Sequence, residues 1–157
     1  MVREAVSIPL IAAGGIASGK SILAVEALGA DGVQVGSRFA ASEESSLHEN
    51  FKKKIVETNE GDTILTMKQL TPVRLIKNKF FKQVEEAELR GASVEEMKTL
   101  LGRARAKKGM FEGDLDEGEL EIGQVAAAIR DISPAAEILK EIWTEYLDCK
   151  KALCGKG

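Results

Sequence analysis

Histidine and cysteine, which most metal sites and nucleophilic triads need, are almost absent from this chain of 157 residues. His48 is the only histidine, and the two cysteines, Cys149 and Cys154, lie close together near the C-terminus. This scarcity predicts neither a disulfide framework nor a zinc site, and it leaves almost nothing for Ser-His-Asp chemistry. We therefore expect no metal ligand and no catalytic side chain of these types, and we interpret His48 as an ordinary surface residue.

Long apolar runs and an excess of positive charge are lacking as well. No run approaches the roughly 20 residues of a membrane span, and the N-terminus has no signal-peptide pattern, so a cytoplasmic location is expected by default. The formal net charge of −3 gives no electrostatic reason to expect nucleic acid or an anionic membrane as a partner. With 44% hydrophobic and 30% charged residues, the composition is that of one globular domain.

Two short apolar runs near the N-terminus each end at glycine. Residues 8–13 predict a fully buried strand that ends at Gly14-Gly15, and residues 33–35 predict a second buried strand that ends at Gly36. Between them, Ser18 is the expected N-cap of a helix that ends near Gly29. The order strand–helix–strand predicts a βαβ unit with parallel strands and a right-handed crossover. Two buried parallel strands cannot cover both of their own edges, which is unusual for a complete domain.

The remainder of the chain is expected to be mostly helical. A helix is predicted from about residue 42 to 59, residues 62–66 are the only other strand-like run, and residues 124–132 are interpreted as helical. Ser93 and Glu96 form the pattern of a capping box, and Ser133-Pro134 is expected to begin an amphipathic helix. We expect a single unit over residues 1–157, with a βαβ core in 1–60 and a helical extension in 61–157. The predicted apolar face of the last helix contains Ile138, Leu139, Ile142, Trp143, Tyr146 and Leu147.

The stretch AAGGIASGKS, residues 12–21, fits the nucleotide-binding pattern G-x-x-x-x-G-K-[ST]. In a P-loop, Lys20 would reach the phosphates and Ser21 would bind Mg²⁺. Such a site also needs a metal-binding carboxylate at the end of a neighbouring strand, but Asp31 and Asp62 both precede their strands. A P-loop nucleotide-binding protein therefore stays open only as an alternative from another functional class.

Two glycine turns after adjacent parallel strands are also a way to hold one phosphate. In (β/α)₈ barrels a phosphate site is frequently built from the loops after strands 7 and 8 and the N-terminus of a short helix. Here these parts would be Gly14-Gly15, Gly36-Ser37 and a helix that begins near Ser42. Glycine is suited to such turns because the backbone N–H groups approach the anion without a Cβ in the way.

Five stretches carry a specific resemblance that covers nearly the whole chain. They are IPLIAAGGIASG, ALGADGVQVGSRFAASEES, DTILT, PVRLIKN and EGDLDEGELEIGQVAAAIRDISPAAEIL. Together they resemble the nitronate monooxygenase (2-nitropropane dioxygenase-like) family of FMN-dependent barrels, whose close relatives are the FMN-dependent enoyl-acyl carrier protein reductases.

The resemblance implies FMN as cofactor and assigns residues to it. The backbone of Gly14, Gly15, Gly36 and Ser37 would hold the FMN phosphate, with Ala13 beside them. Ser37 stands where the family usually has threonine, and either hydroxyl donates a hydrogen bond to phosphate. Gln124 would come near the mouth of the active site, although it is equally interpreted as a polar residue at a helix start. Met67 and Met110 have no motif support and are expected to be packing residues.

The resemblance also implies a fold and a deficit. It predicts an α/β fold that is the C-terminal portion of a TIM (β/α)₈ barrel, with strands 7 and 8, phosphate-binding loops and a helical C-terminal extension. Because a complete barrel needs roughly 250 residues, strands 1 to 6 are expected to be absent. The histidine turn that faces the substrate in nitronate monooxygenases has no counterpart here, and His48 does not match it.

We therefore expect a C-terminal fragment of an FMN-dependent monooxygenase that is inactive alone, with a small-molecule substrate in the full-length family. A fragment of an enoyl-acyl carrier protein reductase is the alternative within the same class. A third possibility is a half-barrel that is completed by self-association through its exposed strand edges.

Overall fold

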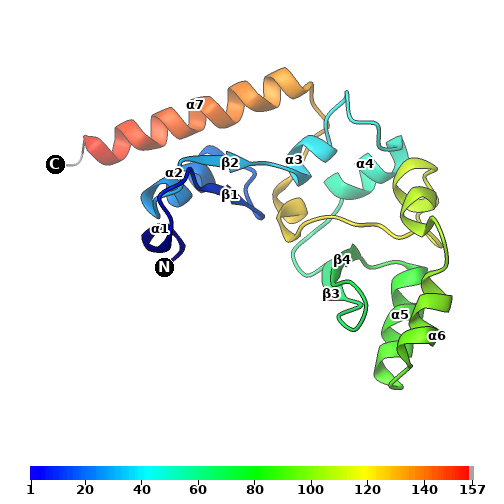
Figure 1. Cartoon of the computed structure of the whole chain (residues 1–157). Coiled ribbons are helices and arrows are strands. Elements are labelled where there is room, and N and C mark those ends of the chain that lie inside the picture. Colours follow the sequence, from blue (N-terminus) through cyan, green and yellow to red (C-terminus); the bar gives the residue numbers. More distant parts are fainter. Residues whose placement is uncertain (156–157) are drawn as a thin grey trace.

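The computed structural model describes residues 1–155, and in this part of the chain it shows a mixed α/β fold with two small two-stranded sheets (Figure 1). The long helix α7 lies alongside α2 near the first sheet, whereas α5 and α6 lie beyond the second sheet (Figure 1). In chain order the elements are α1 (Val2–Ala5), β1 (Ile11–Ala13), α2 (Gly19–Ala27), β2 (Gly32–Gln34), α3 (Ser37–Ala40), α4 (Glu49–Val56), β3 (Thr63–Thr66), β4 (Val73–Ile76), α5 (Lys79–Leu89), α6 (Val94–Leu101), a π-helical turn η1 (Lys107–Phe111), a 3₁₀ turn η2 (Gln124–Ala128) and α7 (Ala135–Cys154).

The N-terminal segment forms the predicted βαβ unit. Strands β1 and β2 pair in parallel, with Ala12 opposite Val33, and α2 connects them. Ser18 caps α2 as predicted, because its Oγ accepts a hydrogen bond from the N–H of Ser21 at 3.2 Å. The helix ends just before Gly29, whose φ of +93° lies in the left-handed region that glycine adopts at low cost.

The prediction that both strands are fully buried is wrong. Ile8 lies outside the strand and is 67% exposed, and Ile11, the first residue of β1, is 55% exposed. The cause is the size of the sheet: within residues 1–155, β1 has β2 as its sole hydrogen-bonded neighbour. A larger parallel sheet would cover these side chains on both faces. Here they remain partly exposed to solvent.

Helix α7 packs on α2 at a close approach of the two backbones. A Cβ added to Gly19 would lie 2.1 Å from the backbone nitrogen of Tyr146, so only glycine fits there. Farther along, the Glu26 carboxylate accepts hydrogen bonds from Lys150 Nζ at 2.6 Å and from the Tyr146 hydroxyl at 2.8 Å. The hydrogen bond from Lys150, followed by that from Tyr146, lowers the pKa of Glu26, and the same Glu26 contact raises the pKa of Lys150.

The predicted apolar face of α7 divides into a buried part and an exposed part. Ile138, Ile142 and Tyr146 are buried. The remaining members of the face, Leu139, Trp143 and Leu147, are exposed, and Trp143 is 53% exposed although its ring lies 5.0 Å from that of Tyr146. Within the described residues, no helix, α7 included, is both long and apolar enough to cross a bilayer.

The single helix predicted from about residue 42 to 59 is wrong, because this segment contains a turn region followed by α4. Ser42 forms an isolated parallel bridge with Ser133, and the N–H of Glu43 donates to the Ser133 carbonyl at 3.1 Å. This pairing takes residues 42 and 43 out of any helix. Helix α4 begins only at Glu49, after His48, whose Nδ1 accepts a hydrogen bond from the N–H of Asn50.

The segment after residue 60 contains a β-hairpin rather than one isolated strand. Strand β3 confirms the run at 62–66, but its antiparallel partner β4 escaped prediction, since VRLI is short and has an arginine among its apolar residues. Residues 120–122 run along the other edge of β4, where the N–H of Ile122 donates to the Arg74 carbonyl at 3.2 Å. The capping box of Ser93 and Glu96 is confirmed at the start of α6. A separate core joins the hairpin to α5 and α6 and contains Met67, Leu75, Phe80, Phe81, Val84, Ala87, Ala92 and Met97.

The helix predicted over residues 124–132 is limited to the turn η2, after which the chain is extended. The buried guanidinium of Arg38 holds this extended segment. It donates to the Asp131 backbone carbonyl at 3.1 Å and to the Asp131 carboxylate at 3.0 Å. These bonds favour the extended path over a continued helix.

Ser133 is not the cap of α7. Pro134 occupies the N-cap position, while the Ser133 hydroxyl is hydrogen-bonded to the Asp131 carboxylate. The first free N–H of the helix, that of Ala135, instead donates to the Glu44 carboxylate at 2.8 Å. A carboxylate at a helix N-terminus is favourable electrostatically, so the cap comes from a residue that is distant in the sequence.

The side chain of Glu119 is buried, and its backbone packs beside η1. Glu119 is only 7% exposed, and its backbone is pressed against Gly109 of η1, where an added Cβ would lie 2.7 Å from the Glu119 carbonyl oxygen. Burial raises the pKa of the Glu119 carboxyl to about 7, the nearby Glu121 carboxylate adds to the rise, and Arg105 opposes it. The fold therefore favours the neutral form of this side chain.

Replacing Gly19 by alanine tests the contact between α2 and α7. We expect Gly19→Ala to lower the free energy of unfolding by about 1–3 kcal/mol, the usual cost of overpacking, measured by urea denaturation. Gly36→Ala is the matched control, because its φ is −104° and an added Cβ meets no atom within 4 Å. Equal stabilities of the two variants would contradict the close approach of the helices.

The buried Glu119 carboxyl predicts a pH dependence of stability. Because its folded pKa lies near 7 and its ordinary value is 4.5, its contribution is fully present below pH 4.5 and is lost as the pH rises through 7. We expect the stability of the unmodified chain, relative to Glu119→Gln, to fall between these values by at most about 1.4 kcal/mol per pH unit. Parallel curves for the two proteins in urea melts from pH 4 to 8 would show that Glu119 titrates normally.

Candidate functional site

The first glycine turn leaves its backbone open at the carboxyl end of β1. Gly14 and Gly15 follow the strand directly and have φ values of +91° and +71°. A Cβ added to either would meet no atom within 4 Å. Backbone conformation, rather than crowding, is thus what requires glycine here, and the peptide groups of the turn face free space. Ala13, the last residue of β1, lies opposite Gln34 of β2.

The second turn, Gly36-Ser37, lies at the same edge of the sheet. Because β1 and β2 are parallel, the loops that follow them leave on the same side (Figure 1). The short helix after this turn begins at Ser37 and not near Ser42, since the N–H of Ala40 donates to the Gly36 carbonyl at 3.0 Å and closes the turn early. The expected start of this helix is therefore corrected, and Ser37 itself becomes its first residue.

Ser37 contacts a segment that is distant in the sequence. Its Oγ accepts a hydrogen bond from the N–H of Gly123 at 3.2 Å. Gln124 is the next residue, lies at the start of η2 and is exposed. The fold thus brings Ser37 into contact with Gly123, the residue before Gln124. Ser37 and Gln124 are both predicted site residues.

A shallow, open depression of about 550 Å³ lies around this contact. Of the predicted residues, Gly36 and Ser37 line it, whereas Ala13, Gly14, Gly15 and Gln124 do not. The remaining lining residues are Ala40, Pro72, Val73, Arg74, Glu121, Ile122 and Gly123. The predicted residues therefore form two groups on one edge of the chain: the turn after β1, and the turn after β2 with its depression.

Sequence reasoning missed Arg74 and Gly123 in this depression. Arg74 lies on β4, and its guanidinium donates to the backbone carbonyl of Thr63 at 2.8 Å and to its hydroxyl at 3.2 Å. Gly123 precedes Gln124 in the quoted stretch GELEIGQ. No local pattern signals either residue, because both reach the depression through the pairing of residues 120–122 with β4.

The residues that match the P-loop pattern are engaged in helix capping and packing. The N–H of Gly19 donates to the Glu145 carboxylate of α7 at 2.7 Å, and Lys20 Nζ lies 3.5 Å from the same carboxylate. The Ser21 hydroxyl accepts from the N–H of Ser18 within the capping box. A nucleotide phosphate would have to displace Glu145, so the structure argues against the P-loop alternative.

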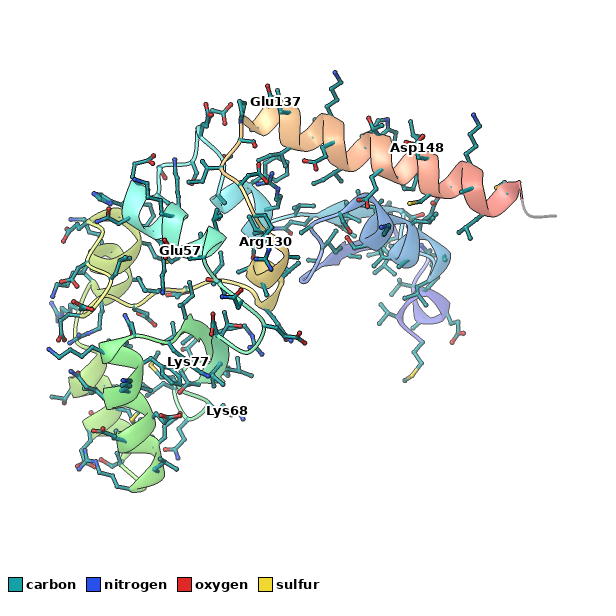
Figure 2. All side chains as sticks on the ribbon, turned by 180° about the vertical axis from the view of Figure 1, so that it is seen from behind. Glu57, Lys68, Lys77, Arg130, Glu137 and Asp148 are labelled. Carbon is teal, nitrogen blue, oxygen red and sulfur yellow. The ribbon has the colours of Figure 1, made fainter. Side chains whose placement is uncertain are left out.

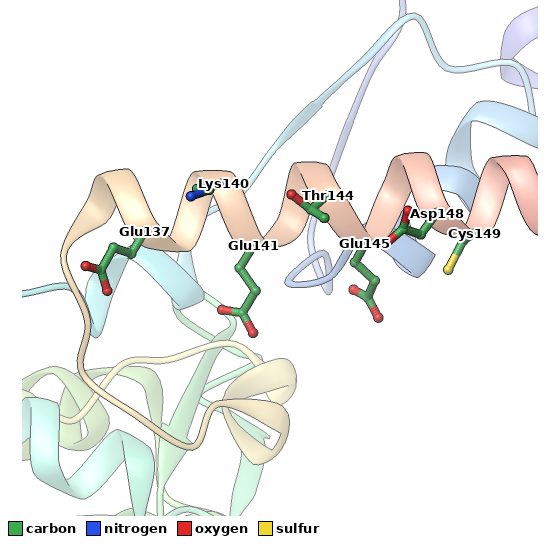
Figure 3. A pocket seen from close by; sticks show the side chains of 7 residues that line it. All are labelled: Glu137, Lys140, Glu141, Thr144, Glu145, Asp148 and Cys149. Atoms are coloured by element: carbon green, nitrogen blue, oxygen red, sulfur yellow. The ribbon is translucent and has the colours of Figure 1, made fainter.

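Two other concave regions of the surface are accounted for by a helix surface and by packing contacts, and we assign no ligand to either. The surface in Figure 3 is lined by side chains of α7 alone, with Glu141 and Glu145 pointing to the same side, so no second element encloses a ligand there. A more polar cleft contains Arg38, Asp131 and Arg130, which lies just after η2 (Figure 2). Arg38 is paired with Asp131, and Arg130 donates to the Thr58 carbonyl at 3.1 Å, so these charges serve packing.

Of the residue types that are scarce in the sequence, the histidine has a structural role. His48 caps α4, and Cys149 and Cys154 are unpaired residues of α7. Met67 is buried in the core of the hairpin, and Met110 packs against the larger core, so the interpretation of both as packing residues is confirmed. Among residues 1–155, no group of three His, Cys, Asp or Glu side chains is arranged to hold a metal ion.

The chain is similar in sequence and in structure to several known proteins. A probable nitronate monooxygenase of Bacillus subtilis is 33% identical over 143 residues, which make up 90% of this chain and 41% of that protein. FabK from Thermotoga maritima superposes with a TM-score of 0.91 at 36% identity, over 99% of this chain and 50% of that one. A nitroalkane oxidase from Streptomyces ansochromogenes gives a TM-score of 0.77 at 32% identity, over 97% and 43%.

The chain therefore spans half or less of the length of these relatives. The profile of the nitronate monooxygenase family matches residues 1–145, nearly the whole chain. Sequence, fold and profile agree with the resemblance carried by the five stretches quoted above, and the chain belongs to the nitronate monooxygenase family.

Proposed function

We propose that this chain supplies the FMN-phosphate site of an FMN-dependent oxidoreductase of the nitronate monooxygenase type. The observation that carries the proposal is the pair of open glycine turns, Gly14-Gly15 and Gly36-Ser37, at the same edge of the parallel strands β1 and β2. Turns at the carboxyl ends of adjacent parallel strands are a common place for phosphate in α/β folds.

The residues present fit a phosphate group. At Gly14, Gly15 and Gly36, the space that a Cβ would take is free of other atoms, so an anion is able to approach the backbone closely. Successive N–H groups in such turns form anion-binding concavities, and the hydroxyl of Ser37 adds one side-chain donor. Ala13 and Gln124 belong to the proposal as neighbours of the two turns, with Gln124 toward the active-site mouth.

The chemistry of the reaction would belong to the flavin, which supplies hydride and electron transfer when it is bound. The part of the chain that the structure describes contributes no residue that we assign to acid–base catalysis, because His48 caps a helix and the buried Glu119 lies outside the lining of the depression. We therefore propose that this chain binds the phosphate and requires the remainder of the family's barrel for turnover. In this proposal it is the C-terminal portion of the barrel, inactive alone.

Reduction of an enoyl thioester is the second candidate activity. It is favoured by the likeness to FabK, whose TM-score of 0.91 exceeds the 0.77 for the nitroalkane oxidase. The phosphate site is the same in either case, because it rests on the backbone of the two turns. In both activities the substrate would be a small molecule or a carrier-bound acyl group, bound next to the flavin ring.

We also propose that the isolated chain associates with a second copy of itself. Two groups of exposed apolar side chains carry this proposal: Ile8 and Ile11 at and before β1, and the stripe of Leu139, Trp143 and Leu147 on α7. An open strand edge and an apolar helix stripe are surfaces that folded proteins usually cover. In a full-length relative, we expect the rest of the barrel to cover them.

The proposed cofactor site predicts saturable binding of FMN to the purified chain, followed by flavin fluorescence. We expect Gly15→Val to weaken it about ten-fold or more, since valine is strained at positive φ and its branched side chain obstructs the turn. Gly61→Val is the matched control, because Gly61 has a φ of +84° and equally open surroundings in the turn before β3. If both variants weakened FMN binding equally, or if the chain bound ATP–Mg²⁺ in place of FMN, the assignment of the FMN-phosphate site would be wrong.

The apolar stripe predicts the oligomeric state. By light scattering after size-exclusion chromatography, we expect the unmodified chain to be dimeric or larger and Leu147→Lys to shift it toward the monomer. Asp148→Lys introduces a lysine at an exposed position of α7 that faces away from the stripe and should leave the mass unchanged. A monomeric unmodified chain at the highest attainable concentration would refute self-association.

A further inference from the structure

The contact between Gly123 and Ser37 is so close that a side chain at position 123 would displace the Ser37 hydroxyl. A Cβ added to Gly123 would lie 2.7 Å from the Ser37 Oγ, whereas the next nearest atoms, Ser37 Cβ and Val125 Cγ1, are both 3.9 Å away. The backbone of Gly123 has φ −68° and ψ 156°, which any residue adopts. Glycine at position 123 therefore leaves space for a single atom, the hydroxyl oxygen of Ser37, in the position that it occupies.

The hydrogen bond from Gly123 determines which donor and acceptor positions of the Ser37 hydroxyl stay free. A serine hydroxyl has one proton to donate and two lone pairs that accept. The N–H of Gly123 occupies one lone pair, at 3.2 Å. Among the described residues no acceptor takes the Ser37 proton, so the proton stays available for an anion at the turn after β2.

Both sides of the contact are fixed independently of any ligand. The segment before Gly123 is paired with β4, through the N–H of Ile122 on the Arg74 carbonyl and the bridge between Glu121 and Leu75. On the other side, Ser37 begins α3 next to Arg38, which is buried and bonded to Asp131. The position of the hydroxyl is thus set by two parts of the fold that meet at this point.

We propose that Gly123 is a positioning residue for the cofactor phosphate: its N–H orients the Ser37 hydroxyl as an acceptor, so that the hydroxyl donates its own proton to the phosphate. This inference rests on the proposed function of the two turns. It adds a residue that lies outside both turns, and it links phosphate binding to the segment that leads into Gln124.

The test compares FMN with riboflavin, which lacks the phosphate, on four variants of the full chain. We expect Ser37→Ala and Gly123→Ala each to weaken FMN binding about ten-fold, the usual loss for one hydrogen bond to a charged group, and to leave riboflavin binding unchanged. The double variant should bind FMN as Ser37→Ala does, because without the hydroxyl the Cβ at position 123 has nothing closer than 3.9 Å. Ser37→Thr, which keeps the hydroxyl, should bind like the unmodified chain.

The outcomes separate this inference from the function on which it rests. If the unmodified chain binds no FMN, the proposed function fails and this inference fails with it. Two results would overturn the inference while FMN still binds. In the first, Gly123→Ala weakens FMN binding as much in the Ser37→Ala background as in the unmodified chain. In the second, Gly123→Ala weakens riboflavin binding as much as FMN binding, and in either case Gly123 acts on packing alone. Thermal melts of all variants identify any loss that is due to unfolding.

Discussion

The contact between α2 and α7 is the constraint on which the βαβ unit, and with it the proposed phosphate site, depends. A sheet of two parallel strands is too small to bury its own side chains, and Ile11 is accordingly half exposed. Order in the βαβ unit therefore comes from α7, which approaches so closely at Gly19 that no side chain fits between the backbones. Hydrogen bonds stabilise both ends of this contact. At one end the Glu145 carboxylate accepts from the N–H of Gly19, and at the other Glu26 accepts from Tyr146 and Lys150.

The same contact engages the residues at the end of the nucleotide-binding pattern. The end of the pattern GGIASGKS supplies a close-packing glycine, a lysine paired with Glu145 and a capping serine. What remains free is the beginning of the pattern, the turn of Gly14 and Gly15, whose backbone faces open space. The open backbone of the segment thus lies in the turn rather than at the helix start, which is where we propose that a flavin phosphate binds.

The second turn is connected to the rest of the molecule by long-range pairing. Residues 120–122 run along β4, and Leu120, Ile122, Ala126 and Ile129 enter the larger core with Phe51 and Ile55 of α4. This core carries Gly123 to Ser37 and, through Arg38 and Asp131, holds the extended segment that leads into α7. The two turns are therefore positioned by different parts of the chain, one by α7 and one by the core around α4.

Local signals in the sequence were sufficient for the βαβ unit and for the caps at Ser18 and Ser93, whereas the family followed from a resemblance over nearly the whole chain. They were insufficient wherever a distant residue determines the local conformation. Glu44 rather than Ser133 caps α7, Arg38 holds residues 129–133 extended, and Ser133 pairs with Ser42 and removes the expected helix start. For the candidate site, the sequence predicted the glycine turns, which stay a prediction. Gly123 and Arg74 were not predicted, because each reaches Ser37 or its depression only through the pairing of two segments about 50 residues apart.

The most direct test of the account is an NMR titration of the ¹⁵N-labelled chain with FMN, and in parallel with riboflavin. If the two turns hold the phosphate, the amide resonances of Gly14, Gly15, Gly36 and Ser37 should shift together with FMN and should not move with riboflavin. Shifts confined to Gly19, Lys20 and Ser21, or the same shifts with both flavins, would contradict the central claim that these glycine turns form a phosphate site.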